Sequence, residues 1–416
     1  MTLAAFAAYG IELEYMVVDT GTLAVRPVVD ELLRRHAGAI TGDFEDGAVT
    51  WSNELALHVV ELKHTAPAPL RGGARAFAAS AARADATLRG IGCRLLPGGM
   101  HPWMRPDEFR RWPHDNAAIY AAYDRIFDCR GHGWSNLQSC HLNLPFADDR
   151  EFERVHLAAR ALLPLLPALS AASPFCEGRF TGWLDFRLET YRHNQQRVPR
   201  ITGAVVPEPV RSRQQYFDTI LRPMWADIAP LDGDGLLQEE WLNSRGAVAK
   251  FSRDALEIRL LDCQESPFCD FAICALVVAV LQALAGERWA SLDDLAALPT
   301  EQLAQQLLDV ARDADRAVVR MPALLAALGL DARAAAAGDV WRRLADAVLP
   351  DAAHVDADLV PPLQTILAHG PLARRMLDAV GTAPDAAALR ALARKLADCL
   401  VPGSPPVFVP SAARRS

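Results

Sequence analysis

Apolar and polar residues alternate with a period of two along four segments in the first 270 residues of the chain. Such alternation sends successive side chains to opposite faces of a strand, so it predicts strands over residues 11–18, 57–63, 137–144 and 255–263. Residues 74–89 and 152–169 instead carry apolar side chains at three- and four-residue spacing, which is typical of helices. The mixture predicts an α+β fold with helices against one side of a largely antiparallel sheet.

The pattern changes near Asp270, beyond which the chain is rich in Ala, Leu and Arg at helical spacing. We therefore predict a core over residues 1–290, a helical part of the same unit over 291–402, and a tail over 403–416. The longest uncharged apolar run, residues 271–286, is too short to span a bilayer and is predicted to be a buried helix.

Composition excludes several classes of function. The chain has 416 residues, 51% of them hydrophobic, and a net charge of -8, which gives no electrostatic footprint for nucleic acid or for an anionic membrane. The first nine residues lack the basic region of a signal peptide. The eight scattered cysteines form no CxxC pair, which favours free thiols in a reducing cytoplasm. We therefore expect small-molecule partners, and a homo-oligomer is compatible with the sequence.

Neither a GxxxxGK[ST] loop nor a GxGxxG turn is present, so nucleotide binding would need another solution. Acidic residues and one imidazole do occur inside the predicted strands. For each strand taken alone, a half-solvated sheet with polar residues outward explains them. Carboxylates gathered on one sheet face repel each other, however, unless cations lie between them. Together they predict a Mg²⁺ or Mn²⁺ site that works with a phosphorylated cosubstrate. The residues concerned are Glu12, Glu14, Glu54, Glu61, His141 and Glu257.

Two spacings bear on this site. Glu257 and Arg259 share a strand face, which places a guanidinium for phosphate or carboxylate beside a ligand, although a surface ion pair would look the same. Gln138 and His141 are three residues apart and cannot share a face of a regular strand. One of these two therefore lies at a strand end or outside the site.

Polar loops supply candidates for contacting ATP or the substrate. Several arginines around residues 187–200 could hold a triphosphate or an anionic substrate, and a solvated helix face is the alternative. Residues 241–246 and the turn around residue 101 offer further polar groups near the same strands. The candidates are Arg187, Arg192, Asn194, Arg197, Gln138, Asn243, Arg245 and His101.

The order of these motifs resembles the type-2 glutamate–cysteine ligase (carboxylate–amine ligase) family, of the glutamine-synthetase-like superfamily. The similarity extends over about residues 8–285 and rests on five motifs: Gly10-Ile-Glu-Leu-Glu-Tyr15, Asn53-Glu-Leu55 with Val60-Glu-Leu62, Gly99-Met-His-Pro102, Gln138-Ser-Cys-His-Leu-Asn-Leu144 and Leu256-Glu-Ile-Arg259. The resemblance implies a curved antiparallel sheet with helices on its convex side. It also implies metal binding by the six acidic and imidazole residues, with Arg259 facing the transferred phosphoryl group.

The resemblance further implies an ATP- and Mg²⁺-dependent ligase that forms an amide through an acyl phosphate, with catalytic roles for Glu257 and Arg259. The stretch 182–208 departs from the better-known members, so glutamate and cysteine serve only as the reference substrates. Two alternatives remain open: a small-molecule kinase on the same fold, and a non-catalytic metabolite-binding protein derived from such a ligase.

Overall fold

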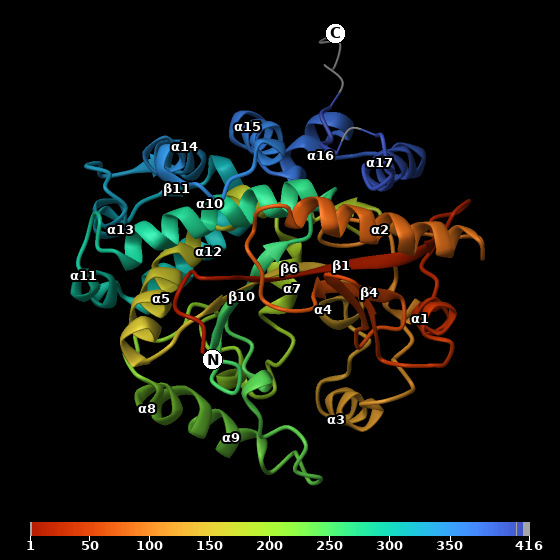
Figure 1. Cartoon of the computed structure of the whole chain (residues 1–416), viewed down its shortest axis with the longest axis horizontal. Helices are drawn as coiled ribbons and strands as arrows, with labels where there is room; N and C mark the ends of the chain where they lie inside the picture. The colour runs from red at the N-terminus through yellow and green to blue at the C-terminus, as the bar shows by residue number, and fades with distance from the viewer. Residues whose placement is uncertain (1, 405, 411–416) are drawn as a thin grey trace.

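One antiparallel sheet forms the centre of the molecule. The computed structural model describes residues 2–404 and 406–410, and places eight strands in one sheet with the order β2-β3-β4-β1-β6-β10-β9, while β5 pairs with β1 (Figure 1). Because β1 pairs with β4 and with β6, it lies in the middle of the sheet. The strands are β1 Gly10–Asp19, β2 Asp43–Asp46, β3 Val49–Asn53, β4 Val59–His64, β5 Cys93–Leu96, β6 Ser139–Pro145, β9 Ala247–Lys250 and β10 Ala255–Asp262.

The strands and helices predicted from periodicity are present, which confirms the α+β fold class. Each predicted strand matches an observed one with small shifts at its ends. The helix expected over residues 74–89 is α2, Gly73–Arg89, and the one expected over 152–169 is α5, Asp149–Leu162, followed by a short turn and by α6, Pro167–Ser170. Pro164 and Pro167 lie where α5 ends, and each removes a backbone donor from a continuing helix.

Helices cover one face of the sheet. The helices α2 and α5 contact its strands directly, and α10, Pro267–Ala285, packs across both of these helices (Figure 1). By length and composition alone α10 could cross a membrane, yet 83% of its most apolar window is buried inside the protein. It is the buried helix that the apolar run predicts. The remaining helices before α10 are α1 Val29–Ala37, α3 Ala117–Phe127, α4 His132–Ser135, α7 Phe186–Tyr191, α8 Arg213–Tyr216 and α9 Arg222–Ile228.

The C-terminal part is helical and lies on the outer side of α10 (Figure 1). Its α14 and α15 contact α10, and the apolar core cluster extends from Tyr9 to Leu400 without a break between the predicted parts. The division at residue 290 stays a prediction. Of the predicted tail, residues 405 and 411–416 lie outside the described residues. The helices here are α11 Leu292–Ala297, α12 Thr300–Asp313, α13 Pro322–Ala327, α14 Ala337–Val348, α15 Val360–His369, α16 Leu372–Val380 and α17 Ala386–Asp398.

A buried histidine makes the stability of this core depend on pH. His156 of α5 is fully buried, and its Nε2 lies 2.9 Å from the backbone oxygen of Glu208. Its Nδ1 has no hydrogen-bond partner among the residues that the structure describes. Burial lowers the pKa of His156 to about 4, against about 6.5 in an unfolded chain. Below pH 6.5 the His156 imidazole binds a proton in the unfolded state but stays neutral in the folded state. The free energy of unfolding therefore falls as the pH falls toward 4.

We expect His156→Gln to reduce this pH dependence, because a glutamine can keep the hydrogen bond to the Glu208 oxygen but cannot titrate. Between pH 7 and pH 4.5 the free energy of unfolding should fall by about 2–3 kcal/mol more in the wild type than in the variant. Urea unfolding at both pH values measures the difference. Equal losses in the two proteins would contradict the account.

Candidate active site

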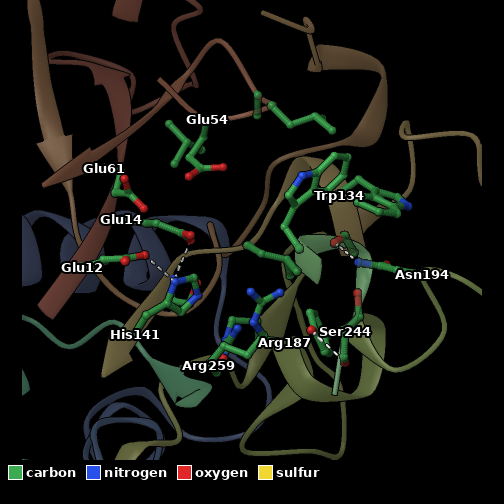
Figure 2. A pocket seen from close by; sticks show the side chains of 18 of the residues that line it. Glu12, Glu14, Glu54, Glu61, Trp134, His141, Arg187, Asn194, Ser244 and Arg259 are labelled. Atoms are coloured by element: carbon green, nitrogen blue, oxygen red, sulfur yellow. Dashed lines mark hydrogen bonds and ion pairs between the residues drawn. The ribbon is translucent and has the colours of Figure 1, made fainter. Parts of the chain in front are cut away.

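A cavity of about 330 Å³ lies over the sheet face that carries Glu12 and Glu14 of β1. Residues of β1, β4, β6 and β10 form its floor, and segments around α3, α4 and α7 form its sides (Figure 2). We call it the acidic cavity. It is lined by Glu12, Glu14, Glu54, Leu55, Ala56, Val59, Glu61, Tyr123, Gly133, Trp134, Leu137, Ser139, His141, Arg187, Tyr191, Asn194, Gln195, Trp241, Ser244, Lys250, Glu257 and Arg259.

Strand register brings the acidic residues together. Glu12 and Glu14 point to one face of β1 because they are two residues apart. Glu61 of β4 lies opposite Glu14, and His141 of β6 lies opposite Glu12. Each of the two strands beside β1 therefore adds one polar group next to these carboxylates. Glu54 follows β3 and lines the same cavity (Figure 2).

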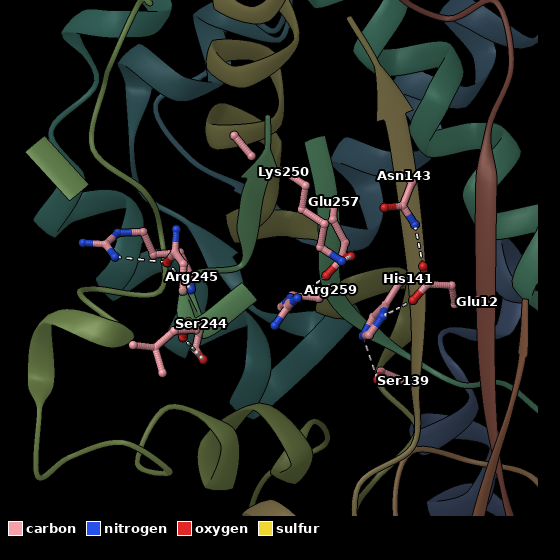
Figure 3. Close-up of polar contacts among 12 residues, drawn as sticks. Glu12, Ser139, His141, Asn143, Ser244, Arg245, Lys250, Glu257 and Arg259 are labelled. Carbon is pink, nitrogen blue, oxygen red and sulfur yellow. Dashed lines mark hydrogen bonds and ion pairs between the residues drawn. The ribbon is translucent and has the colours of Figure 1, made fainter. Parts of the chain in front are cut away.

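Hydrogen bonds fix the positions of these carboxylates. The Glu12 oxygens lie 3.0 Å from Nδ1 of His141 and accept a 3.0 Å hydrogen bond from Nδ2 of Asn143 (Figure 3). Glu14 accepts a 2.7 Å bond from the backbone N–H of Ser139. Glu12 and Glu14 therefore have defined orientations before any ligand binds, as a preorganised binding site requires.

Negative charge is crowded inside this cavity. Burial, with the neighbouring charges of Glu61 and Glu14, raises the pKa of Glu54 well above its usual value. Burial and the charge of Glu12 also raise the pKa of Glu61, although Lys63 lies 2.8 Å from it. Burial alone would raise the pKa of Glu12, but the hydrogen bond and charge of His141 hold it below the usual range.

The donor set suits a hard divalent cation. One ligand atom each from Glu12, His141 and Glu257 lies within 4.8 Å of the others. Carboxylate oxygens with a single imidazole are ligands that Mg²⁺ and Mn²⁺ accept, and a cation among them would relieve the repulsion between the carboxylates. The residues present therefore fit the predicted ion.

Two cationic side chains meet at Glu257. Arg259 donates to one oxygen of this fully buried carboxylate and Lys250 to the other (Figure 3). The pairing of β10 with β6 shifts register between Ile258 and Leu261, so Arg259 lies in a β-bulge. A bulge bends the strand and can change the direction of a side chain. Here the Nε of Arg259 is buried and has no hydrogen-bond partner in the described part of the chain.

Lys250 was not among the candidates taken from the sequence. It lies on β9, where the register pairs it with Ala255 and pairs Val248 with Glu257, so Lys250 is a diagonal neighbour of Glu257. Burial and the charge of Arg259 lower the pKa of Lys250 to about 8. In the sequence, the indication of this neighbour relation was the short connection at residues 251–254 between two apolar runs, which is typical of a hairpin.

Arg187 lines the acidic cavity but is held by the fold. Its Nε donates a 2.5 Å bond to Asp262, and its Nη2 donates a 3.2 Å bond to the backbone oxygen of Arg259. Arg187 and Asp262 form a nearly solvent-free ion pair. Asn194, the other loop candidate in the lining, donates to the backbone oxygen of Gly133.

Six candidates lie outside the lining of the acidic cavity, and the structure gives them contacts within the protein. His101 bonds the backbone oxygen of Leu23 through Nε2 at 2.8 Å and accepts backbone N–H groups at Nδ1. Gln138 comes just before β6, in agreement with the three-residue spacing that put either Gln138 or His141 at a strand end. Its side chain accepts a hydrogen bond from the backbone N–H of Met16. Both side chains are buried and lie outside the lining of the acidic cavity, so their contact with a substrate stays a prediction.

The other four are likewise engaged elsewhere. Arg245 donates two 2.7 Å bonds to Glu208, and Asn243 donates to the hydroxyl of Tyr216. These contacts hold the segment before β9 in place. Arg192 pairs with Glu189. Arg197 donates to the backbone oxygen of Ile126 and lines a neighbouring cavity.

Several lining residues were not among the candidate site residues taken from the sequence. Tyr123, Trp134 and Trp241 come from α3, α4 and a short turn at Glu240–Leu242. Tyr191 and Gln195 reach the cavity from the arginine-rich stretch and both bond to Ser244. Aromatic residues in loops are usually packing residues, so only the folded arrangement identifies these as part of the cavity.

Comparisons with known proteins place the chain in a family. The family model described as glutamate–cysteine ligase family 2 matches residues 8–395. An uncharacterized protein of Archaeoglobus fulgidus is 35% identical over 306 residues, which are 72% of this chain and 78% of that protein. A protein provisionally named glutamate–cysteine ligase 2-3, from Rubrobacter xylanophilus, is 28% identical over 44% of this chain and 47% of its own length. The chain thus matches about half the length of this named relative.

Solved structures share the fold at low sequence identity. The glutamate–cysteine ligase of Francisella tularensis, in complex with AMP, has a TM-score of 0.61 and 12% identity, with 94% of this chain and 88% of that chain covered. A bifunctional glutathione synthetase from Pasteurella multocida has a TM-score of 0.60 and 14% identity, with 94% and 52% covered. Because the family model matches nearly the whole chain, the protein belongs to glutamate–cysteine ligase family 2, a family of ATP-dependent ligases.

Proposed function

We propose that this protein joins a carboxylate to an amine at the expense of ATP, through an acyl phosphate formed in the acidic cavity. The observation that carries the proposal is the grouping of Glu12, His141 and Glu257 around one point, with Arg259 bonded to Glu257. A site of this kind binds a cation and a phosphate side by side. Membership of a ligase family supports the same reaction class.

Mg²⁺ or Mn²⁺ would be held by Glu12, His141 and Glu257, with Glu14, Glu54 and Glu61 beside them. When bound, the ion would polarise phosphoryl oxygens and neutralise charge that develops on them. The chain's own part is to present rigid oxygen ligands. The hydrogen bonds from Asn143 and from the Ser139 backbone hold these ligands in orientation.

Arg259 is the residue that we assign to the transferred phosphoryl group. Its guanidinium is anchored on Glu257, and its Nε has no partner within the described residues. In the first step a carboxylate oxygen of the substrate attacks the γ-phosphorus, the bond to the β,γ-bridging oxygen breaks, and ADP leaves. A fixed guanidinium stabilises the charge on the equatorial oxygens during this transfer.

In the second step the amine nitrogen attacks the carbonyl carbon of the acyl phosphate. Phosphate leaves with one oxygen of the original carboxylate, and the nitrogen loses a proton. The side chains around α3, α4 and α7 form the sides of the cavity and would limit the access of water, which otherwise hydrolyses the intermediate. The eight cysteines are free thiols, which fits the reducing cytoplasm that we propose as the location.

A screen for product tests the proposal. ATP and Mg²⁺ are supplied with a grid of carboxylic acids, including amino acids, crossed with amines, and ADP, phosphate and product mass are measured. We expect ADP and phosphate in equal amounts and a product whose mass equals acid plus amine minus water. ADP without free phosphate would indicate a kinase instead, and no nucleotide turnover or binding would contradict an enzymatic role.

We expect Glu257→Gln to lower ATP turnover by at least about 100-fold, because it removes a ligand charge and leaves Lys250 and Arg259 without their partner. Glu240→Gln is the matched control, since Glu240 bonds Ser252 outside the acidic cavity. Circular dichroism verifies the fold of both variants. Unchanged turnover in Glu257→Gln would remove Glu257 from the site.

Arg259→Lys should lower kcat about 100-fold with little change in the KM for ATP. A lysine keeps the charge but loses the planar fork that can hold Glu257 and a phosphoryl oxygen together. Steady-state kinetics with varied ATP separates the two constants. An increase in KM alone would show that Arg259 contributes to ground-state binding and not to the transfer.

A further inference from the structure

We propose that the carboxylate substrate has a flat, apolar body of the aromatic kind, which packs against Tyr123, Trp134 and Trp241. These three residues are called the aromatic wall below. The inference rests on the proposed ligase function and specifies the substrate class of that site. It departs from glutamate, whose body is small and carries a second charge.

The aromatic wall is a connected surface inside the acidic cavity. The ring centroids of Tyr123 and Trp134 are 5.3 Å apart, and those of Tyr123 and Trp241 are 5.9 Å apart. Leu55, Val59 and Leu137 add aliphatic groups to the lining. Surfaces of this kind bind flat apolar groups, because rings gain both burial and offset or edge-to-face contacts.

Trp134 separates two cavities. A neighbouring cavity of about 690 Å³ is lined by Phe127, Phe186 and Arg197, and it shares Gly133, Trp134 and Asn194 with the acidic cavity. Trp134 is partly buried and packs against Tyr123 and Phe127, and the rest of its side chain lines the two cavities. A bound ring would cover the part of the indole that lines the acidic cavity.

Figure 2 shows Arg187 and Arg259 side by side next to His141, with Trp134 on their other side and Glu54 across the cavity from Trp134. A substrate carboxylate held near these guanidiniums, next to the phosphoryl group, would extend its body away from the metal ligands. That direction leads to the aromatic wall.

The cavity offers little to a second carboxylate such as that of glutamate. Among the lining residues the lysines and arginines are Arg187, Lys250 and Arg259. Each already has a carboxylate partner, either Asp262 or Glu257. A further anion against the aromatic wall would lose hydration without gaining a cation.

The nucleotide has room on another side. A cavity of about 610 Å³ shares Glu12 with the acidic cavity and is lined by Tyr9, His64 and two cations, Lys63 and Arg253. A triphosphate near Glu12 could therefore continue into this space, which leaves the aromatic wall for the organic substrate. Adenine on the wall is the competing arrangement, and the experiment separates the two.

The experiment measures binding and turnover separately. Calorimetry with Mg²⁺ and a nonhydrolysable ATP analogue compares phenylalanine, tyrosine, tryptophan, 3-phenylpropionate and indole-3-acetate with alanine, leucine, glutamate and hexanoate. We expect at least one aromatic acid to bind about tenfold more tightly than every aliphatic acid. If no aromatic acid binds more tightly than the aliphatic ones, the inference is wrong.

A hydroxylamine trap reports the first chemical step with the same acids, because hydroxylamine converts an acyl phosphate into a hydroxamate and phosphate. Hydroxamate from the aromatic acids supports both proposals. If hydroxamate forms faster from glutamate than from the aromatic acids, the inference about the substrate is wrong, but the proposed ligase function is supported. Tight aromatic binding without hydroxamate from any acid overturns the ligase chemistry while the binding preference stands.

Variants of the wall identify the occupant. Trp134→Leu and Trp241→Leu should each weaken aromatic acid binding about tenfold and leave the affinity for the ATP analogue unchanged. Trp289→Leu is the control, because Trp289 lines neither cavity. Thermal melting checks that each variant folds. If one of the two variants of the aromatic wall does not fold, the other still tests the inference. Loss of nucleotide affinity with unchanged acid affinity would place adenine on the wall and overturn the inference.

Discussion

Electrostatic repulsion among carboxylates confined to one sheet face is the constraint on which the rest of the site depends. Glu14 of β1 is paired with Glu61 of β4, Glu12 lies two residues before Glu14 on the same face of β1, and Glu54 lines the same cavity. Burial strengthens their repulsion, which is visible in the raised pKa of Glu54. The fold offsets part of the charge through neighbouring basic groups, and cations with phosphate are the chemistry that would balance the remainder. The basic neighbours are Lys63, His141, Lys250 and Arg259.

The acidic cavity thus has two chemically different halves. The sheet strands supply rigid charged groups, whose spacing is set by backbone register, and the segments around α3 and α4 supply aromatic side chains. Rigid strands suit a reaction that depends on the exact placement of phosphoryl oxygens. Loops and short helices can vary without disturbing that placement, so the half that contacts the organic substrate is free to differ between relatives.

Periodicity was enough to predict four of the eight strands of the sheet, and a long uncharged apolar run was enough to predict the buried helix α10. The acidic residues could be predicted as a group because a period of two places Glu12 and Glu14 on one face. The loop candidates were less predictable: the burial of His101 and the pairing of Arg245 with Glu208 depend on distant segments. The β-bulge at Arg259 and the aromatic wall likewise arise from tertiary contacts that leave no local pattern.

Transfer of an oxygen atom tests the central claim most directly. If the reaction passes through an acyl phosphate, a substrate acid labelled with ¹⁸O at both carboxylate oxygens must lose one labelled oxygen to the released phosphate. Mass spectrometry of the phosphate, after turnover with ATP, Mg²⁺ and an amine, measures this transfer. We predict one ¹⁸O atom in each phosphate formed together with amide. Amide formation with unlabelled phosphate would contradict the account of this site.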